Sequence, residues 1–391
     1  MKTIATLLIA LLMAGCASAP PGPPAPSRVF SDAAFRPPSE PIGADDLFTL
    51  SPEMQAYVNS PAFHAHVRDK GPENGLVDAL YQRGELKLEY DAATTRNAAQ
   101  TYAARQGNCM SLVIMTAAFA KALGLAVHYQ SVVVDETWRR ASGLYLASTH
   151  VNLSLRKSLM QNARGVDRYE STLTIDFLPS EDVDAYRSHE IDETAIVAMY
   201  MNNRAVEALL QNHVDTAYWW ARAAVEKNPA FIAAYNTLAV IYQRHGDQAM
   251  AERSFRAALE REPENVMVMQ NLAPLLAALG KQEEAQAMTR RLATIEPYPP
   301  FYFFNLGMAA MERKDFQQAK TLFAREVRRA PYSDEFHFWL GVAHLRLGDA
   351  AQARAQIALA LDTSTTLDGR TLYAAKLDHL RAQKPQRSPG Y

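Results

Sequence analysis

Hydrophobic and polar residues in the middle of the chain first follow a helical period. Residues 97–105 have a helical pattern, and Thr94 or Thr95 is placed to cap a helix there. A Gln-Gly-Asn turn follows. A second helical pattern begins at Cys109, with apolar residues three or four positions apart, and reaches Gly124, a residue typical of helix ends. The pattern therefore predicts two consecutive helices, the second of which starts at a cysteine.

Three apolar runs after this helix, at 126–134, 144–155 and 171–178, predict β-strands. In the second run, polar residues from His150 onward alternate with apolar ones, as in a half-buried strand with one polar face. Asp176 belongs to a similar polar row in the third run. If these two strands pair in antiparallel fashion, His150 and Asp176 can be neighbours on one face.

The second half of the chain repeats itself with a period of 34 residues. Prolines and glycines recur at equivalent positions of the repeat, 34 residues apart: Pro229, Pro263, Pro297 and Pro331, and Gly246, Gly280 and Gly348. Lys314 stands where the series of glycines has a gap. Period and pattern match the tetratricopeptide repeat, a pair of packed helices. We expect about five repeats over 196–363, then a capping helix and tail at 364–391.

Arrays of this kind form a concave surface that binds peptide or protein, so the repeats predict such a partner. A rigid spacer or a brace for the preceding domain is the alternative. Aromatic residues are frequent in the repeats, and most have the spacing of core positions. The segment 297–301, Pro-Tyr-Pro-Pro-Phe, departs from a normal junction between repeats and can present aromatic surface.

The N-terminus follows the plan of a secretory signal peptide, with a charged start, an apolar run and small residues before Cys16. The run is too short to span a bilayer as a helix. Its end, Met-Ala-Gly-Cys, resembles a bacterial lipobox, whose cysteine is acylated. We expect a signal peptide at 1–15, lipid on Cys16 and a proline-rich tether over 16–42. The alternative is an ordinary cleaved signal with an incidental cysteine.

The composition limits the number of domains and the classes of function that the chain can have. Hydrophobic residues make up 48% of the chain, which is enough to form hydrophobic cores, and the length of 391 residues fits two or three domains. A net charge of −2 gives no reason to expect nucleic-acid binding. The sequence contains no glycine-rich phosphate loop, and His64 and His66 lack a third spaced ligand, so no cofactor or metal is predicted.

The sequence contains two cysteines, and a lipid on Cys16 leaves Cys109 as an unpaired thiol in an exported protein. A cysteine in the first turn of a helix lies at the positive end of the helix dipole, which favours the thiolate. Backbone N–H groups there can stabilise an oxyanion. With His150 as base and Asp176 as orienting carboxylate, Cys109 completes a nucleophilic triad. Gln106 is a further candidate for the oxyanion site.

Each member of this triad has a simpler interpretation. Cys109 can be a small buried hydrophobic residue. His150 can be a hydrogen-bonded strand histidine, and Asp176 a surface residue of its strand.

Short motifs around these residues resemble the bacterial transglutaminase-like superfamily. Arg-Gln-Gly-Asn-Cys-Met-Ser-Leu at 105–112 and Ala-Lys-Ala-Leu-Gly-Leu at 120–125 resemble its nucleophile helix. Thr-His-Val-Asn-Leu at 149–153 resembles its histidine strand, and Leu-Thr-Ile-Asp-Phe-Leu-Pro at 173–179 its aspartate strand. The resemblance covers about 80–190. The family's aromatic residue after the histidine and its Asp-Pro-Thr run are both replaced here, which bears on the substrate class.

The resemblance implies a papain-like fold, with Cys109 as nucleophile, His150 as general base and acid, and Asp176 orienting the imidazole. The expected fold class is thus an α+β papain/transglutaminase-like core at 43–190, followed by an all-α tetratricopeptide-repeat solenoid at 196–363. The expected location is the bacterial cell envelope, lipid-anchored in the outer membrane and facing the periplasm.

We expect a thiol enzyme that hydrolyses or transfers the acyl group of a peptide or protein amide. Hydrolysis by a peptidase or amidase is favoured over acyl transfer, because water is always present. The alternative is a catalytically silent scaffold for an envelope complex. A redox-sensing thiol is a third interpretation, but it lacks a resolving cysteine.

Overall fold

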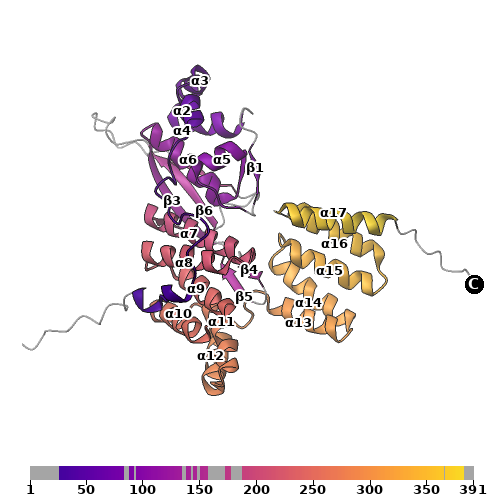
Figure 1. Cartoon of the computed structure of the whole chain (residues 1–391). Coiled ribbons are helices and arrows are strands. Elements are labelled where there is room, and N and C mark those ends of the chain that lie inside the picture. Colours follow the sequence, from indigo (N-terminus) through magenta and orange to yellow (C-terminus); the bar gives the residue numbers. More distant parts are fainter. Residues whose placement is uncertain are drawn as a thin grey trace, which may run out of the picture.

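The computed structural model of the chain describes residues 26–82, 88–91, 94–133, 138–141, 144–147, 150–156, 172–177, 187–364 and 366–382. The expected signal peptide, Cys16 and the first part of the tether lie outside these residues. An N-terminal part of helices and strands precedes an arc of paired helices that runs to the C-terminal helix (Figure 1). Among the described helices, none combines the length and the apolar character that a membrane crossing requires.

Between residues 52 and 122 the described part of the N-terminal region contains six helical elements: α2 (Pro52–Val58), α3 (Pro61–Lys70), α4 (Pro72–Val77), the π-helical turn η3 (Asp78–Gln82), α5 (Ala98–Ala104) and α6 (Cys109–Ala122). Helix α5 is capped by Asn97, which forms a reciprocal capping box with Gln100, and not by Thr94 or Thr95 as the sequence suggested. Helix α6 begins at Cys109 as expected.

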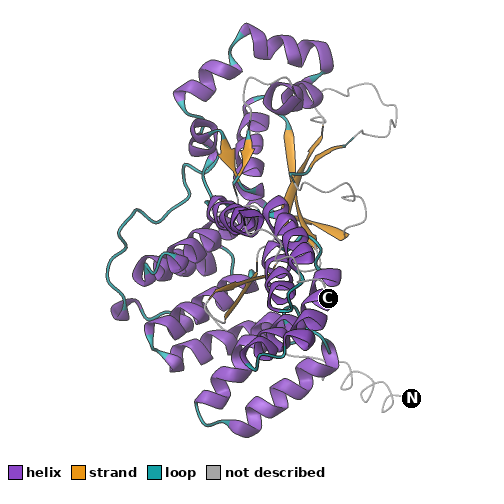
Figure 2. Ribbon diagram, turned by 90° about the vertical axis from the view of Figure 1, so that its right-hand side faces the viewer, coloured by secondary structure: helices purple, strands orange, loops and turns teal. Residues whose placement is uncertain are grey.

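A four-stranded antiparallel sheet with the order β7-β6-β3-β8 packs with α6 (Figure 2). Its strands are β3 (Ala126–Val133), β6 (His150–Arg156), β7 (Leu173–Ile175) and β8 (Arg187–Ile191). The apolar row of β6 is fully buried in the same core as α6. The polar row is buried too, because its side chains bond to residues of β7 and its end, which differs from the half-buried strand we expected.

The apolar run at 144–155 is two strands and not one. Its first residues form β5 (Leu144–Ala147), which pairs with β4 (Trp138–Ala141) in a separate antiparallel hairpin. Only the remainder belongs to β6. A third, parallel pair joins β1 (Glu89–Tyr90) to β2 (Gln106–Gly107), directly before α6.

Over residues 193–363 the structure contains five antiparallel helix pairs: α7 (Glu193–Leu210) with α8 (Val214–Lys227), α9 (Ile232–His245) with α10 (Gln248–Arg261), α11 (Val266–Ala278) with α12 (Gln282–Ile295), α13 (Tyr302–Glu312) with α14 (Phe316–Arg329), and α15 (Asp334–Arg346) with α16 (Ala350–Thr363). Helix α17 (Leu367–Ala382) follows. Small residues bring the helices close: a Cβ atom on Gly307 would lie 2.6 Å from the Phe323 ring. The helical repeats read from the 34-residue period are therefore present.

Residues 26–42, which we call the strap, lie against the repeats. The strap includes the short helices η1 (Pro26–Val29) and η2 (Asp32–Ala34), and η1 lies beside α10 (Figure 1). Phe35 stacks on Tyr218 of α8 with ring centroids 3.9 Å apart. The Tyr242 hydroxyl donates to the carbonyl of Val29 at 2.9 Å. Residues 26–42 of the proline-rich tether expected over 16–42 therefore pack on the repeats, through apolar side chains such as Phe35.

Candidate functional site

Cys109 is the first residue of α6 and is a free, partly exposed thiol. The side chain of Asn108 caps the helix: its Oδ1 accepts from the Ser111 N–H at 2.9 Å and from the Ser111 hydroxyl at 2.8 Å. The cap holds the backbone of the first turn in place, so Cys109 lies at the positive end of the helix dipole.

His150 and Asp176, taken from different strands, form a buried pair. His150 Nε2 lies 2.7 Å from Asp176 Oδ1, and their side chains are 3% and 9% exposed. The second oxygen, Oδ2, accepts from Asn152 Nδ2 at 3.0 Å. Asn152 orients the carboxylate and was not among the candidates, although it occupies the next polar position of the row that begins at His150.

The pKa of the His150 imidazole reflects its burial and the nearness of both Asp176 and Cys109. Burial lowers that pKa, but the hydrogen bond to Asp176 and the interactions with Cys109 and with the carboxylate charge raise it more, to about 9. Because Asp176 binds Nε2, Nδ1 is the nitrogen left for Cys109. The structure thus brings all three predicted triad residues together, with the imidazole favouring its protonated form at neutral pH.

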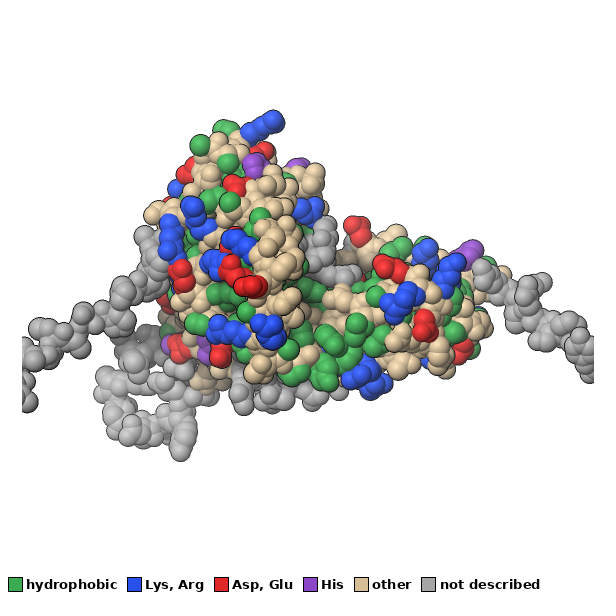
Figure 3. Space-filling view, turned by 90° about the horizontal axis from the view of Figure 1, so that it is seen from below, with side chains coloured by type: hydrophobic (Ala, Val, Ile, Leu, Met, Phe, Trp, Pro, Cys, Tyr) green, Lys and Arg blue, Asp and Glu red, His purple; other side chains and the backbone are tan. Residues whose placement is uncertain are grey.

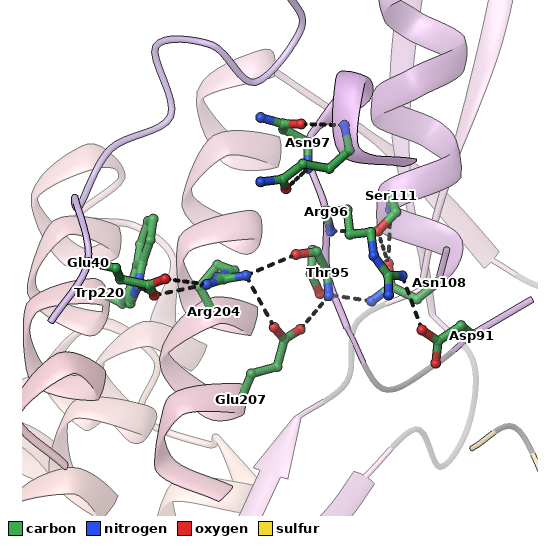
Figure 4. Close-up of polar contacts among 11 residues, drawn as sticks. Glu40, Asp91, Thr95, Arg96, Asn97, Asn108, Ser111, Arg204, Glu207 and Trp220 are labelled. Carbon is green, nitrogen blue, oxygen red and sulfur yellow. Dashed lines mark hydrogen bonds and ion pairs between the residues drawn. The ribbon is translucent and has the colours of Figure 1, made fainter. Parts of the chain in front are cut away.

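A polar network connects the cap of α6 to the first repeat (Figure 4). Asn108 Nδ2 donates to Thr95 Oγ1 at 2.8 Å, and the Thr95 N–H donates to Glu207 Oε1 of α7 at 2.6 Å. Arg204 of α7 binds both oxygens of Glu40 at 2.8 and 2.9 Å. Burial raises the pKa of Glu207 to about 7, against the hydrogen bonds from Thr95. Arg204 and Glu207 did not stand out in the sequence, because these partners are 164 and 112 residues away.

The other residues that the sequence singled out lie outside the group of Cys109, His150 and Asp176. Gln106 lies in β2, where its backbone carbonyl accepts from Arg96, and its role as an oxyanion donor stays a prediction. His66 Nδ1 lies 2.7 Å from Asp78 Oδ2, so this histidine is paired with a carboxylate. Among the described residues, no cluster of three or more His, Cys, Asp or Glu side chains could hold a metal ion.

The hairpin β4–β5 reaches into the inner side of the repeat arc (Figure 1). Tyr145 of β5 is buried, and its backbone bonds to side chains of α9 and α11: Asn236 donates to its carbonyl at 3.0 Å, and Asn271 accepts from its N–H at 3.0 Å. Its ring packs near Phe301, with centroids 5.7 Å apart. The unusual junction at 297–301 therefore turns one aromatic residue toward the hairpin, while Tyr298 remains exposed.

Two segments match family models of the tetratricopeptide repeat, residues 232–265 and 304–366. A search of curated protein sequences found no match. Among solved structures, a thermophilic tetratricopeptide protein of Thermus thermophilus is similar over 46% of this chain and 98% of its own, with 20% identity and a TM-score of 0.34. Pseudomonas aeruginosa pilF is similar over 49% and 96%, with 19% identity and a TM-score of 0.31. The two matched segments are repeats of a kind that supports protein–protein interaction.

Proposed function

We propose that this protein is a thiol enzyme that acts on an amide bond of a peptide or protein. The observation that carries the proposal is the buried pair of His150 and Asp176 beside Cys109, at the first turn of α6. A thiol nucleophile, a histidine base and a carboxylate that orients the base are the three groups that acyl-transfer chemistry of this kind uses. We extend the proposal to a papain-like fold for the elements that present these residues, because the sequence motifs around them resemble that family.

In the proposed reaction, the Cys109 thiolate attacks the amide carbonyl, and the carbonyl oxygen becomes an oxyanion near the N–H groups of the α6 first turn. The His150 imidazolium gives its proton to the nitrogen of the leaving amine as the C–N bond breaks. The resulting thioester is attacked by water or by a second amine. The neutral imidazole takes the proton of that nucleophile, and the Cys109 thiolate leaves.

Asp176 and Asn152 act on this chemistry through His150. A carboxylate on Nε2 holds the ring orientation and stabilises the imidazolium, and Asn152 fixes the carboxylate. The proposal includes lipid attachment at Cys16 and a place in the cell envelope, in the outer membrane and facing the periplasm. These parts rest on the sequence pattern of residues 1–16.

A catalytically silent scaffold is the second candidate. One observation favours it: β5 of the N-terminal part is bound by the repeats through Asn236 and Asn271, so the repeats have a task that needs no catalysis. Both candidates share a peptide or protein partner bound by the repeats.

Alkylation of Cys109 separates the two candidates. In the full chain carrying Cys16→Ser, Cys109 is the only thiol, and we expect His150→Ala to slow its reaction with iodoacetamide at pH 7 at least about tenfold, because the imidazolium that favours the thiolate is gone. Asp176→Asn keeps the size of the side chain and should slow the reaction less.

His128→Ala is the matched control, since His128 lies in the adjacent strand β3 and pairs with Glu190 instead. Its alkylation rate should equal that of the unaltered protein. Equal rates in all of these proteins would contradict an activated Cys–His pair and favour the scaffold.

A further inference from the structure

The repeats bind the backbone of β5 and not only its side chain. Asn236 Nδ2 and Asn271 Nδ2 both donate to the carbonyl oxygen of Tyr145, at 3.0 and 2.9 Å. Asn271 Oδ1 accepts from the N–H of the same residue at 3.0 Å. An extended strand of any sequence offers these two groups, so this part of the recognition is independent of side-chain identity.

The side chain of Tyr145 supplies the selective part. Its ring shares a buried cluster with Phe301 and with Met267 of α11. Asn305 of α13 donates to its hydroxyl at 2.7 Å. Three consecutive repeats thus contact one residue, and they select for an aromatic ring with a hydroxyl at its tip.

The groups that contact Tyr145 also have features of their own in the repeats. Asn271 also donates to Asn236 Oδ1 at 2.9 Å, and the two amides are 1% and 0% exposed. Phe301 has a left-handed backbone, with φ of 66°, which is uncommon for a bulky residue and indicates local strain. Buried side-chain amides and a strained aromatic residue would lower the stability of a helical repeat array that bound nothing. They are expected where the array binds a strand whose backbone satisfies the amides.

We propose that Asn236, Asn271, Asn305 and Phe301 form a binding site for one extended, tyrosine-bearing peptide segment, and that β5 is its resident ligand. A partner segment of the same chemistry takes the place of β5. This inference rests on the part of the proposed function in which the repeats bind peptide or protein, and it is independent of the chemistry of Cys109.

A labelled peptide with the sequence of residues 138–147 tests the site by fluorescence anisotropy. The protein is the full chain with Cys16→Ser, with and without Tyr145→Ala. We expect the peptide to bind the Tyr145→Ala protein at least about tenfold more tightly than the unaltered chain, because the resident strand has lost its anchor. A control peptide with alanine at the tyrosine position should bind at least about tenfold more weakly than the original.

Replacing Asn236 and Asn271 by alanine in the Tyr145→Ala protein should weaken binding at least about tenfold, since three hydrogen bonds to the peptide backbone are lost. The two peptides make the test valid even if this variant folds poorly. Equal binding of both peptides to the Tyr145→Ala protein would overturn the inference. An unreactive Cys109 together with tyrosine-dependent binding would refute the enzyme proposal and leave this site standing.

Discussion

At the scale of single residues, the charge on His150 connects the candidate site to stability. In an unfolded chain its pKa is near 6.5, and in the folded protein Asp176 and Cys109 raise it to about 9. Folding therefore favours the protonated imidazole. The resulting contribution to stability is complete below pH 6.5 and is lost as the pH rises through 9.

We therefore predict that the free energy of unfolding decreases between pH 6.5 and 9, by on the order of 3 kcal/mol from this residue. Urea denaturation at a series of pH values measures it. His150→Gln should flatten the dependence in that window, whereas His128→Gln should leave it unchanged. If the free energy of unfolding of the His150→Gln protein still decreases between pH 6.5 and 9, other groups are responsible for the effect.

Lys314 occupies a position at which the backbone is left-handed in every equivalent repeat, where the other residues are glycine or asparagine. Its φ is 62°, and the equivalent residues 34 positions apart are Asn212, Gly246, Gly280 and Gly348, with φ between 63° and 95°. The sequence pattern identified Lys314 as a substitute for glycine, and the structure gives the consequence: a side chain in a conformation that costs about 1 kcal/mol or more.

Lys314→Gly should therefore raise the free energy of unfolding by about 0.5–1 kcal/mol. This net value is the relief of backbone strain minus the stability lost because glycine makes the unfolded chain more flexible. Lys320→Gly is the matched control. It lies inside α14 and should lower stability by about 1 kcal/mol. Urea midpoints of both proteins test the prediction, and a lower midpoint for Lys314→Gly would contradict it.

The sequence could predict site residues only where the signal is local. Cys109 follows a turn at a helix start, and His150 and Asp176 belong to alternating rows, so their meeting could be expected. Glu207 and Tyr145 could not be found in this way. Their partners are 112 and 126 residues distant, and neither a glutamate in an amphipathic helix nor a tyrosine in a strand has a distinctive pattern.

At the scale of elements, the start of α6 matters most. Asn108 caps the helix and also binds Thr95, so it fixes both the first turn and the distance to the first repeat. Loss of a cap costs about 1 kcal/mol, and loss of a buried hydrogen bond adds to this.

Asn108→Ala should lower the free energy of unfolding by about 1–3 kcal/mol and should also slow Cys109 alkylation. Asn265→Ala removes the equivalent cap of α11, far along the chain from the site. It should lower stability by about 1 kcal/mol and leave the alkylation rate unchanged. If both variants slow alkylation equally, the effect is general destabilisation and not positioning of Cys109.

Element boundaries followed the sequence where caps and glycine mark them, as at Cys109 and in the repeats. The division of 144–155 could not be predicted. No glycine or proline divides this run, and the residue of β5 that bonds to the repeats, Tyr145, has its partners far along the chain. For the same reason the prolines of 26–42 suggested a tether, although Phe35 and Val29 are buried against distant helices.

At the scale of the whole molecule, the strap, the hairpin β4–β5 and the polar network between Thr95 and Glu207 all join the N-terminal part to the repeats. Seen from below, the molecule has a larger and a smaller lobe, the smaller one being the C-terminal helices from α13 onward, and hydrophobic side chains gather where the two lobes meet (Figure 3). The strap contributes an aromatic cluster in which Phe35 contacts Tyr218, Tyr242 and His245.

Phe35→Ala should therefore lower the free energy of unfolding by about 3 kcal/mol, as for other buried aromatic residues, and should make residues 26–42 sensitive to protease. Tyr332→Ala is the control, because Tyr332 is 66% exposed and should change stability by less than about 0.5 kcal/mol. Protection of the strap in the Phe35→Ala protein would show that its polar contacts suffice to hold it.

The strap has a further consequence for the order in which the chain acquires structure. Ser31, Arg36 and Ser39 bond to residues 177–187 positions later, whereas each helix pair of the repeats is built from neighbouring segments. During synthesis the strap emerges early and has no partner until α8 has been made. Local helix pairs form fast and non-local contacts form slowly. The first described residues of the chain are therefore among the last to reach their native place.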